Sequence, residues 1–412
     1  MKNLKTREKI NVAIIGVGNC AKSLVEGVSL YKDNTDNDIN GIMLTDIGGY
    51  RPGDIRFVAA FDVDTRKINK ELSIAINEKP NCAYTIKEDA SDVCEGTIVK
   101  QSPRLDGVGP LMENDIDKDR SHLAASDDNK LSKEEIIKEL HDKKVDVIIN
   151  YLPVGSQEAT EFWMECALEA KVHVVNCIPV FIASNLEWEQ RFIDAGLTII
   201  GDDMRSQFGA SIISTVLQEL LFTRGHEVLM HYQDNIGGNC DFKNMQDPTR
   251  LASKKISKEN VIKNQNKLHG KSIEPNSIHA GPAQYFTSLG DNKRAHWLIK
   301  ATGFGGAPVE FTADLSVQDS PNSAGVVIDA IRLCIVASEM GIVGAIHGAS
   351  AATQKTPPVD MASSLAKQEC ISLANRRYTD FTKHQQAKLN PNASTLHKIF
   401  EKLAQDLHDE AN

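Results

Sequence analysis

The alternation of apolar and polar positions divides the chain into two parts of different character. In the first part, short runs that are apolar throughout, beginning with Ile10–Ile15, alternate with amphipathic stretches. Such runs are expected of parallel strands that helices cover on both faces. The amphipathic stretches are expected to be the covering helices. The predicted strands are 10–15, 56–62, 145–149, 172–177 and 197–201, and the predicted helices are about 21–30, 132–143, 157–170 and 184–195. This order predicts an α/β fold with a doubly wound, Rossmann-type parallel sheet.

Polar segments interrupt this order. Residues 32–54 separate the first predicted helix from the second strand, as an insertion would. The stretch from 79 to 144 is also polar, and most of it, from 85 to 130, predicts a loop or surface extension before the helix at 132. Near the C-terminus, apolar side chains recur at Leu396, Ile399, Phe400, Leu403 and Leu407. That spacing predicts a helix that covers the fold or an interface.

The second part changes to the two-residue period of strands. It alternates over 226–233, 278–286, 295–302 and 308–317, with a predicted helix from about 210 to 223 and a short helix from 253. Period-two alternation is typical of strands with one covered face. We therefore predict an inserted α+β domain at residues 206–315 with a mostly antiparallel sheet. Residues 1–205 plus 316–412 would form a discontinuous nucleotide-binding domain.

Composition argues against several classes of protein. The 412 residues carry a formal charge of −10 and a sequence pI near 5.7, whereas nucleic-acid-binding proteins normally present a basic surface. The eight cysteines are scattered without C-x-x-C spacing, so neither a disulfide framework nor a zinc site is expected. No carboxylate cage for a metal is visible, and a cation activator stays open. No signal peptide and no apolar run of about 18 residues is found, so we expect a cytoplasmic protein without a membrane segment.

Gly16, Gly18 and Ala21 form the pattern G-x-G-x-x-A between the first predicted strand and helix. Gly16 would allow the tight turn, Gly18 the close approach of a pyrophosphate, and Ala21 close packing of the helix on the strand. Asn19 lies inside this turn and is a further candidate cofactor contact. The alternative is a tight turn that binds nothing.

Asp62 and Asn150 end predicted strands at the edge of the sheet where cofactors bind. Asp62 would accept hydrogen bonds from the ribose hydroxyls of NAD and would repel the 2′-phosphate of NADP. It lies 44 residues after Gly18 rather than the usual about 20, and removing the insertion 32–54 restores the spacing. Asp64 is the alternative acid.

Several polar stretches of the second part are candidate substrate contacts. The turn with Ser206, Gln207, Gly209 and Ala210 opens a helix and offers amides and hydroxyls to a phosphate, although a hydroxyl-rich helix cap is equally consistent. Asn235 and Asn239, predicted to lie in a loop beyond a strand, suit the hydroxyls of a sugar.

Lys254 and Lys258 are four residues apart, so on a helix they share one face. Two like charges repel, and this placement costs stability unless an anion lies between them. The alternative is a solvated basic face.

The stretch 316–332 carries a strand end, a turn and then an apolar helix predicted to start at about Ala324. The amides of Ser323, Ala324 and Gly325 would then be free to bind an anion, with Ser323 as a candidate cofactor contact. Asp319 is a candidate general base or orienting group. The alternative is a capped helix that follows a strand and binds nothing.

Five motifs in this order resemble the myo-inositol-1-phosphate synthase family, in its bacterial and archaeal branch. They are Gly-Asp-Asp-x-x-Ser-Gln-x-Gly (201–209), Asn-x-Gly-Gly-Asn-x-Asp-Phe (235–242), Ser-Lys-x-x-Ser-Lys (253–258), Gly-Asp-x-Lys (290–293) and Gln-Asp-Ser-Pro-Asn-Ser-Ala-Gly-Val-Val-Ile-Asp-Ala-Ile-Arg (318–332). The resemblance spans roughly residues 10–360. The chain departs from eukaryotic members, which have Ser-Gly-Gln where it has Ser-Gln, so the amide that meets the phosphate stays open.

The resemblance implies an isomerase that uses NAD without net consumption and begins inositol biosynthesis. Ring-opened glucose 6-phosphate is oxidised at C5, loses a proton at C6, closes by an aldol reaction of C6 with C1, and is reduced again at C5. It also implies a homotetramer assembled through the inserted sheet.

The resemblance further assigns candidate roles to individual residues. Lys258 would hold the sugar phosphate with the turn at 206–210, and Lys254, Lys293 and Lys355 would surround the reacting oxygens. Asp319, Asn235 and Asn239 would orient sugar hydroxyls, and Asp203 would lie near the nicotinamide. Three rivals stay open: an NAD-dependent sugar-phosphate dehydrogenase, a related cyclase with another sugar phosphate, and a nucleotide-sensing regulator without catalysis.

Overall fold

A parallel sheet of seven strands forms the larger part of the molecule. The computed structural model describes residues 5–37 and 39–389, so the predicted C-terminal apolar stripe lies outside the described residues. The strands are β1 (Ile10–Ile15), β2 (Ile55–Asp62), β3 (Val99–Gln101), β4 (Val147–Asn150), β5 (His173–Asn176), β6 (Thr198–Ile200) and β11 (Gly344–Ala345). Their order is β11-β6-β5-β4-β1-β2-β3, with all neighbours parallel. The predicted doubly wound Rossmann-type sheet is confirmed, and β3 is a strand that we did not predict.

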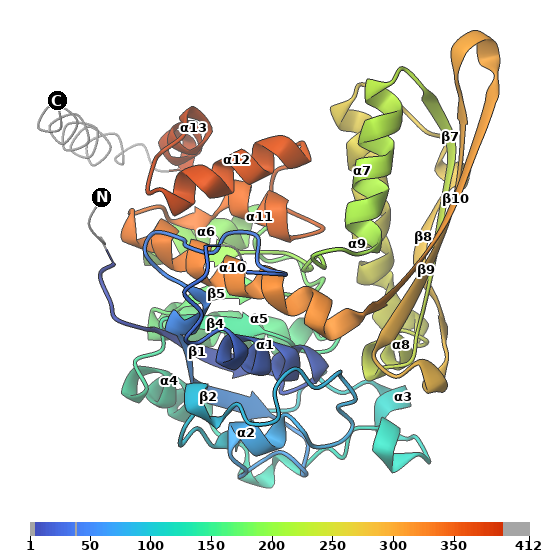
Figure 1. The fold of residues 1–412 in the computed structure, drawn as a ribbon. Helices are drawn as coiled ribbons and strands as arrows, with labels where there is room; N and C mark the ends of the chain where they lie inside the picture. The colour runs from blue at the N-terminus through green and yellow to red at the C-terminus, as the bar shows by residue number, and fades with distance from the viewer. Residues whose placement is uncertain (1–4, 38, 390–412) are drawn as a thin grey trace, which may run out of the picture.

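Helices cover both faces of this sheet, which explains why its strands are apolar throughout (Figure 1). The helices of this part of the chain are α1 (Asn19–Leu30), α2 (Leu72–Ala75), α3 (Pro110–Glu113), α4 (Lys133–Asp142), α5 (Gln157–Ala170), α6 (Leu186–Ala195), α10 (Asp319–Glu339), α11 (His347–Thr353), α12 (Ser363–Ala374) and α13 (Asp380–Leu389). Of these, α3 packs on α8, and α12 packs on α10 and α11, not on the sheet itself. Along β1, Val12 and Ile14 pack with α1 and α10, whereas Ala13 and Ile15 pack with α4, α5 and α6.

A second sheet stands beside the first, with two long helices on one face (Figure 1). Its strands β7 (Glu227–Gly237), β8 (Ile278–Tyr285), β9 (Asn292–Thr302) and β10 (Pro308–Gln318) have the order β10-β9-β7-β8. The helices are α7 (Ala210–Thr223) and α9 (Pro248–Leu268), and the short α8 (Cys240–Asn244) follows β7.

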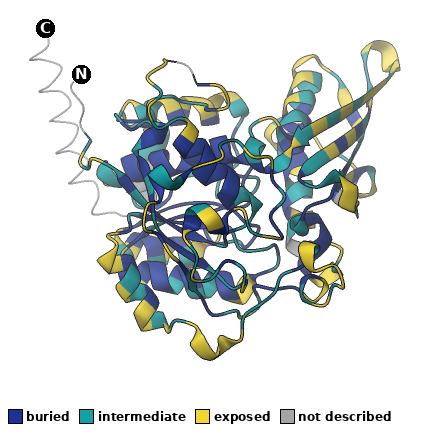
Figure 2. Ribbon diagram, turned by 60° about the horizontal axis from the view of Figure 1, so that its bottom comes forward, coloured by how far each residue is buried: buried dark blue, intermediate teal, exposed yellow. Residues whose placement is uncertain are grey.

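The prediction of a mostly antiparallel second sheet is confirmed, since β10 pairs with β9 and β9 with β7 in antiparallel fashion. β7 and β8 pair in parallel, so the sheet is mixed. A parallel pair needs a long crossover connection, and α9 provides it. The helix predicted to be short from residue 253 therefore spans Pro248–Leu268. β10 contains no buried residue, and its outer end is exposed in Figure 2.

The chain returns from the second sheet to the first through α10, which begins at Asp319 and not at Ala324. Asp291 caps it: its carbonyl accepts from the amide of Asp319 (2.9 Å) and its carboxylate from the amide of Ser320 (2.9 Å). Pro321 is tolerated because an amide in the first turn of a helix has no intrahelical acceptor. The amides of 323–325 lie inside the helix, so the prediction that they face open space was wrong.

Helix α10 is also the anchor for the insertion 32–54. Asp329 and Arg332, both fully buried, form an ion pair of 2.6 Å on one face of the helix. Asp329 accepts from the amide of Met43, and Arg332 donates to the carbonyls of Leu44, Thr45 and Tyr50. By length and composition, α10 could cross a membrane, but 89% of its apolar window is buried inside the fold.

Candidate active site

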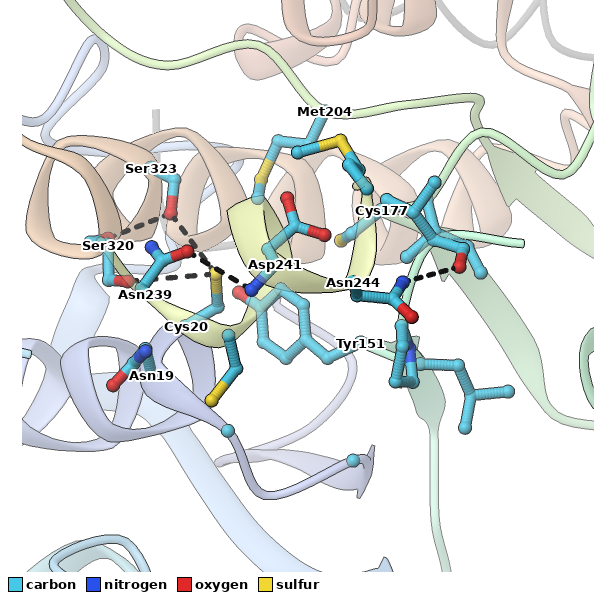
Figure 3. A pocket seen from close by; sticks show the side chains of 18 of the residues that line it. Asn19, Cys20, Tyr151, Cys177, Met204, Asn239, Asp241, Asn244, Ser320 and Ser323 are labelled. Carbon is cyan, nitrogen blue, oxygen red and sulfur yellow. Dashed lines mark hydrogen bonds between the residues drawn. The ribbon is translucent and has the colours of Figure 1, made fainter. Parts of the chain in front are cut away.

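One cavity lies where the carboxyl ends of the parallel strands face the second sheet. Turns after β1, β2, β4 and β5 form one side, and residues of α8, α9 and β7 form the other. Figure 3 shows side chains of α1, α8 and α10 projecting into the same space. The cavity therefore joins the predicted nucleotide site to the predicted sugar-phosphate site.

The glycine-rich turn has the geometry that its motif requires. Gly16 has a φ of +88°, and a Cβ there would lie 2.7 Å from the carbonyl oxygen of Tyr151. A Cβ on Gly18 would meet nothing within 4 Å, so this residue borders open space. Asp62 lines the cavity, and its carboxylate accepts hydrogen bonds from the amides of Val17 (2.7 Å) and Val63 (2.7 Å). Asp62 thus fixes the turn as well as bordering the cavity.

The other candidate cofactor contacts divide into two groups. Asn19 and Ser323 line the cavity. Ala21 is fully buried in the core, as its packing role requires. Asn150 is not among the lining residues: it is fully buried and donates to Asn176 (2.9 Å) behind the edge of the sheet. The strand-end position predicted the correct edge but not the direction of this side chain.

Asp203 is the centre of the charged part of the cavity. It is fully buried and has a φ of +61°, an uncommon conformation for a residue other than glycine. Its carboxylate accepts from Lys254 (2.8 Å), Lys355 (3.0 Å) and the hydroxyl of Ser257 (2.6 Å). Burial acts to raise the pKa of Asp203, but the two ammonium groups hold it well below its usual range. Asp203 is therefore an anion that fixes two lysines side by side.

The remaining two lysines differ from each other in their partners. Lys293 forms an ion pair with Asp319. Lys258 has no carboxylate within 4 Å among the described residues, although it lines the cavity. Burial, followed by the charges of Lys254, Lys355 and Lys293, lowers the pKa of Lys258 well below its ordinary value. Burial likewise lowers the pKa of Lys355 to about 8.

The candidate phosphate turn is only partly open to the cavity. Ser206 and Ala210 line it, whereas Gln207 and Gly209 do not. The amide of Gln207 donates to the carbonyl of Asn322 (2.7 Å), which holds the turn against α10. The amide of Ala210, at the start of α7, has no acceptor among the described residues. A free amide at a helix N-terminus favours an anion.

The two candidate asparagines also line the cavity, but Asn235 lies in β7 and not in the predicted loop. Its amide donates to the carbonyl of Gly281 (2.6 Å). Asn239 caps α8 by accepting from the amide of Asp241 (3.1 Å), and it donates to Asp291 (3.0 Å). Both side chains are therefore held rigidly at the wall.

Sequence reasoning missed a group of lining residues in irregular segments. They include Lys67, Asn81, Ser102, Arg104, His122 and Tyr151, whereas Asp241 and Asn244, which also line the cavity, lie in α8. The stretch 85–130, predicted as loop or surface extension, supplies part of the wall. Irregular segments have no periodicity that could reveal such residues. The position of Tyr151, directly after a strand that ends at the edge of the sheet, was a usable signal.

The residues around the turn fit a bound dinucleotide. The hydroxyl of Tyr151 is buried and has no hydrogen-bond partner among the described residues, although it borders the cavity. A buried hydroxyl without a partner costs about 1–3 kcal/mol. A ligand in the cavity would supply the acceptor. No group of three or more His, Cys, Asp or Glu among the described residues is placed to hold a metal ion.

Comparisons with known proteins agree with this geometry. The family model of myo-inositol-1-phosphate synthase matches residues 209–320. The chain is 42% identical over 365 residues to the inositol-3-phosphate synthase of Mycolicibacterium smegmatis, covering 88% of this chain and 96% of that protein. It is 41% identical over 364 residues to that of Corynebacterium glutamicum, covering 87% and 96%. The chain belongs to the myo-inositol-1-phosphate synthase family. The matched segment of this family contains Lys254, Lys258, Lys293 and Asp319.

A solved structure of the family supports the fold. The myo-inositol-1-phosphate synthase-related protein of Thermotoga maritima superimposes with a TM-score of 0.72, covering 90% of this chain and 100% of that one, at 23% sequence identity. The chain therefore shares its fold, a parallel sheet with a second, mixed sheet, with that protein.

Proposed function

We propose that the chain is an inositol-3-phosphate synthase, which converts glucose 6-phosphate into an inositol phosphate with a dinucleotide cofactor. The observation that carries the proposal is the arrangement of one cavity. A glycine-rich turn borders one end, and four lysines, three of them paired with Asp203 or Asp319, line the other. Cofactor and sugar would thus meet inside one enclosure.

Lys258 and the start of α7 would hold the phosphate of the substrate. Three of the four lysines contact Asp203 or Asp319, whereas Lys258 has no carboxylate within 4 Å among the described residues. A phosphate monoester carries about −1.5 to −2 charges at pH 7, so it would supply the contacting anion that Lys258 lacks. Asn235, Asn239 and Asp319 would orient the hydroxyls of the open-chain sugar.

The cofactor is proposed to be NAD, held by the turn at Gly16, Gly18 and Asn19 and by Asp62. A carboxylate at the position of Asp62 favours ribose hydroxyls over a 2′-phosphate, and so favours NAD over NADP. When bound, NAD would supply the oxidation of C5 of the sugar and its later re-reduction. Tyr151 and Ser323 border the space where the reactive part of the cofactor would lie.

The side chains of the site suit the steps between these two redox events. The C5 ketone acidifies C6, whose proton leaves, and the enolate carbon attacks the C1 aldehyde to form the C6–C1 bond. Negative charge develops on the oxygen at C5 and then on the oxygen at C1. Lys254, Lys355 and Lys293 supply fixed cations at this end of the cavity, and preorganised charges stabilise such oxyanions more than water does. With a pKa of about 8, Lys355 can also exchange a proton near neutral pH.

We further propose a cytoplasmic homotetramer that assembles through residues 206–315. Strand β10 has no buried residue, and large apolar side chains are exposed on the second sheet and on α7. They include Val216, Leu220, Leu229, Phe304 and Phe311. Such exposed apolar side chains could be covered by a second copy of the chain. The cysteines among the described residues are all free, which suits a reducing compartment.

The decisive experiment is incubation of the protein with NAD and glucose 6-phosphate. The proposal predicts an inositol phosphate, detected as periodate-released phosphate, without net NADH. Accumulation of NADH in proportion to substrate would instead identify a sugar-phosphate dehydrogenase. Absence of both products with folded protein would refute an enzyme of either kind on this substrate.

A further inference from the structure

Lys67 is a buried cation at the nucleotide end of the cavity whose ammonium group contacts no carboxylate of the described residues. The residue is 3% exposed and lines the cavity. Its ammonium group donates to the carbonyl of Val17 (2.6 Å) and to the side chain of Asn81 (3.0 Å), both neutral acceptors. A lysine ammonium has three donors, so one N–H remains.

The carboxylates nearest in sequence are committed elsewhere. Asp64 forms a fork-shaped pair with Arg66, with distances of 2.8 Å and 2.5 Å. Asp62 accepts from three backbone amides, those of Val17, Val63 and Asp64. Neither lies within 4 Å of the Lys67 ammonium group. The charge of Lys67 contributes to the lowered pKa of Asp64, but no carboxylate of the described residues contacts its ammonium group directly, whereas a buried charge is normally paired with a contacting opposite charge.

The cavity contains one other cation of this kind. Among its described lining residues, Lys254, Lys355, Lys293 and Arg104 each contact a carboxylate, whereas Lys67 and Lys258 do not. Lys258 lies at the sugar-phosphate end. Lys67 lies against Val17, the middle residue of the G-x-G turn. Each end of the cavity therefore has one ammonium group without a carboxylate of the described residues in direct contact.

We infer that Lys67 binds a phosphate of the dinucleotide cofactor. The inference rests on the proposed function, because it requires a dinucleotide at the glycine-rich turn. Amides of that turn already favour a pyrophosphate, and Lys67 would add the positive charge that the turn itself lacks. Asn81, which donates to the same carbonyl of Val17 (3.1 Å), positions the lysine beside the turn.

The test compares two substitutions that separate charge from hydrogen bonding. Lys67→Gln can still donate to the Val17 carbonyl but has no charge, whereas Lys67→Met lacks both. Affinities of the full-length variants for NADH, ADP-ribose and adenosine are measured by calorimetry, with thermal unfolding as a check on folding. Lys70→Met is the matched control, because Lys70 lies three residues away, is 40% exposed and pairs with Glu78.

A phosphate contact predicts that both Lys67 variants raise the Kd of NADH and of ADP-ribose about 10- to 100-fold. Affinity for adenosine and the affinities of the control would change less than about twofold. If Lys67→Gln keeps the affinity for NADH and only Lys67→Met loses it, the lysine acts through its hydrogen bond to the turn and not through a phosphate. If both variants lose as much affinity for adenosine as for NADH, the lysine contacts the nucleoside. Either result overturns the inference, as do unchanged affinities. If the unaltered protein fails to bind NADH, the proposed function itself fails.

Discussion

Replacing Lys258 with methionine is expected to weaken substrate binding and, at the same time, to stabilise the ligand-free protein. Lys258 lies one helical turn from Lys254, and it has no carboxylate partner among the described residues. Its pKa is lowered well below the ordinary value by burial and by three neighbouring lysines. Methionine keeps much of the aliphatic stem and removes the charge.

The size of both effects follows from the geometry. Side chains one turn apart have Cβ atoms about 6 Å from each other, and two unit charges at that distance repel by about 3 kcal/mol at an effective dielectric constant of about 20. Asp203, which is 2.8 Å from Lys254, offsets most of this repulsion. We therefore expect Lys258→Met to raise the free energy of unfolding of the ligand-free protein by about 1 kcal/mol, which corresponds to about 1–2 °C in Tm for 412 residues. Loss of a charge-assisted contact to phosphate costs about 1.5–3 kcal/mol, which is about 10- to 100-fold in Kd.

The assay measures binding of glucose 6-phosphate by calorimetry without NAD, so that no turnover occurs, together with the Tm of the ligand-free protein. Inorganic phosphate should raise the Tm of the unaltered protein more than that of the variant. Lys255→Met is the matched control, since Lys255 lies on the same helix, is 58% exposed and pairs weakly with Glu259. An unchanged affinity combined with a lower Tm in Lys258→Met would show that the lysine is structural, and would refute the reasoning.

Three further predictions follow from buried charges. Asp203→Asn should lower kcat at least 100-fold and destabilise the fold by about 3–5 kcal/mol, because Lys254 and Lys355 lose their common partner. Steady-state kinetics and denaturant unfolding measure the two effects. A near-normal kcat would contradict the prediction. Because burial lowers the pKa of Lys355 to about 8, the unfolded chain binds one more proton than the folded chain between about pH 8 and 10.5. Lys355 should therefore make the stability of the ligand-free protein rise across that window, by at most about 3 kcal/mol, and the rise should be smaller by this amount in Lys355→Met, where only the contribution of Lys258 remains. Asp329→Asn should leave the charge of the buried Arg332 without an opposite charge, lower the Tm and expose the insertion 32–54 to limited proteolysis. An unchanged cleavage pattern would show that other contacts hold the insertion.

The first sheet was predictable because its signals are local. Apolar runs such as Val147–Asn150 and the turn at Gly16 and Gly18 mark strands and their order along the chain. Strand β3 was missed because it has three residues and lies in a polar stretch. Its pairing with β2 is a contact between distant segments that the local pattern does not contain.

The second sheet and the site depend on contacts between distant segments, which local sequence patterns do not reveal. The parallel pairing of β7 with β8 depends on the crossover through α9, which spacing alone did not reveal. The start of α10 was misplaced because its cap, Asp291, comes from a different turn. Lys254 and Lys258 were found from their spacing and Lys293 and Lys355 from the family resemblance, whereas Lys67 was missed because one lysine in an irregular segment carries no pattern.

The central claim is that one cavity carries out oxidation, ring closure and re-reduction of the same sugar. The most direct measurement uses glucose 6-phosphate with deuterium at C5, incubated with the full-length protein, NAD and an excess of unlabelled NADH. The account predicts an inositol phosphate that retains the deuterium, with no net change in NADH absorbance. Product without deuterium, or NADH that increases with substrate consumed, would contradict a closed cycle within one site.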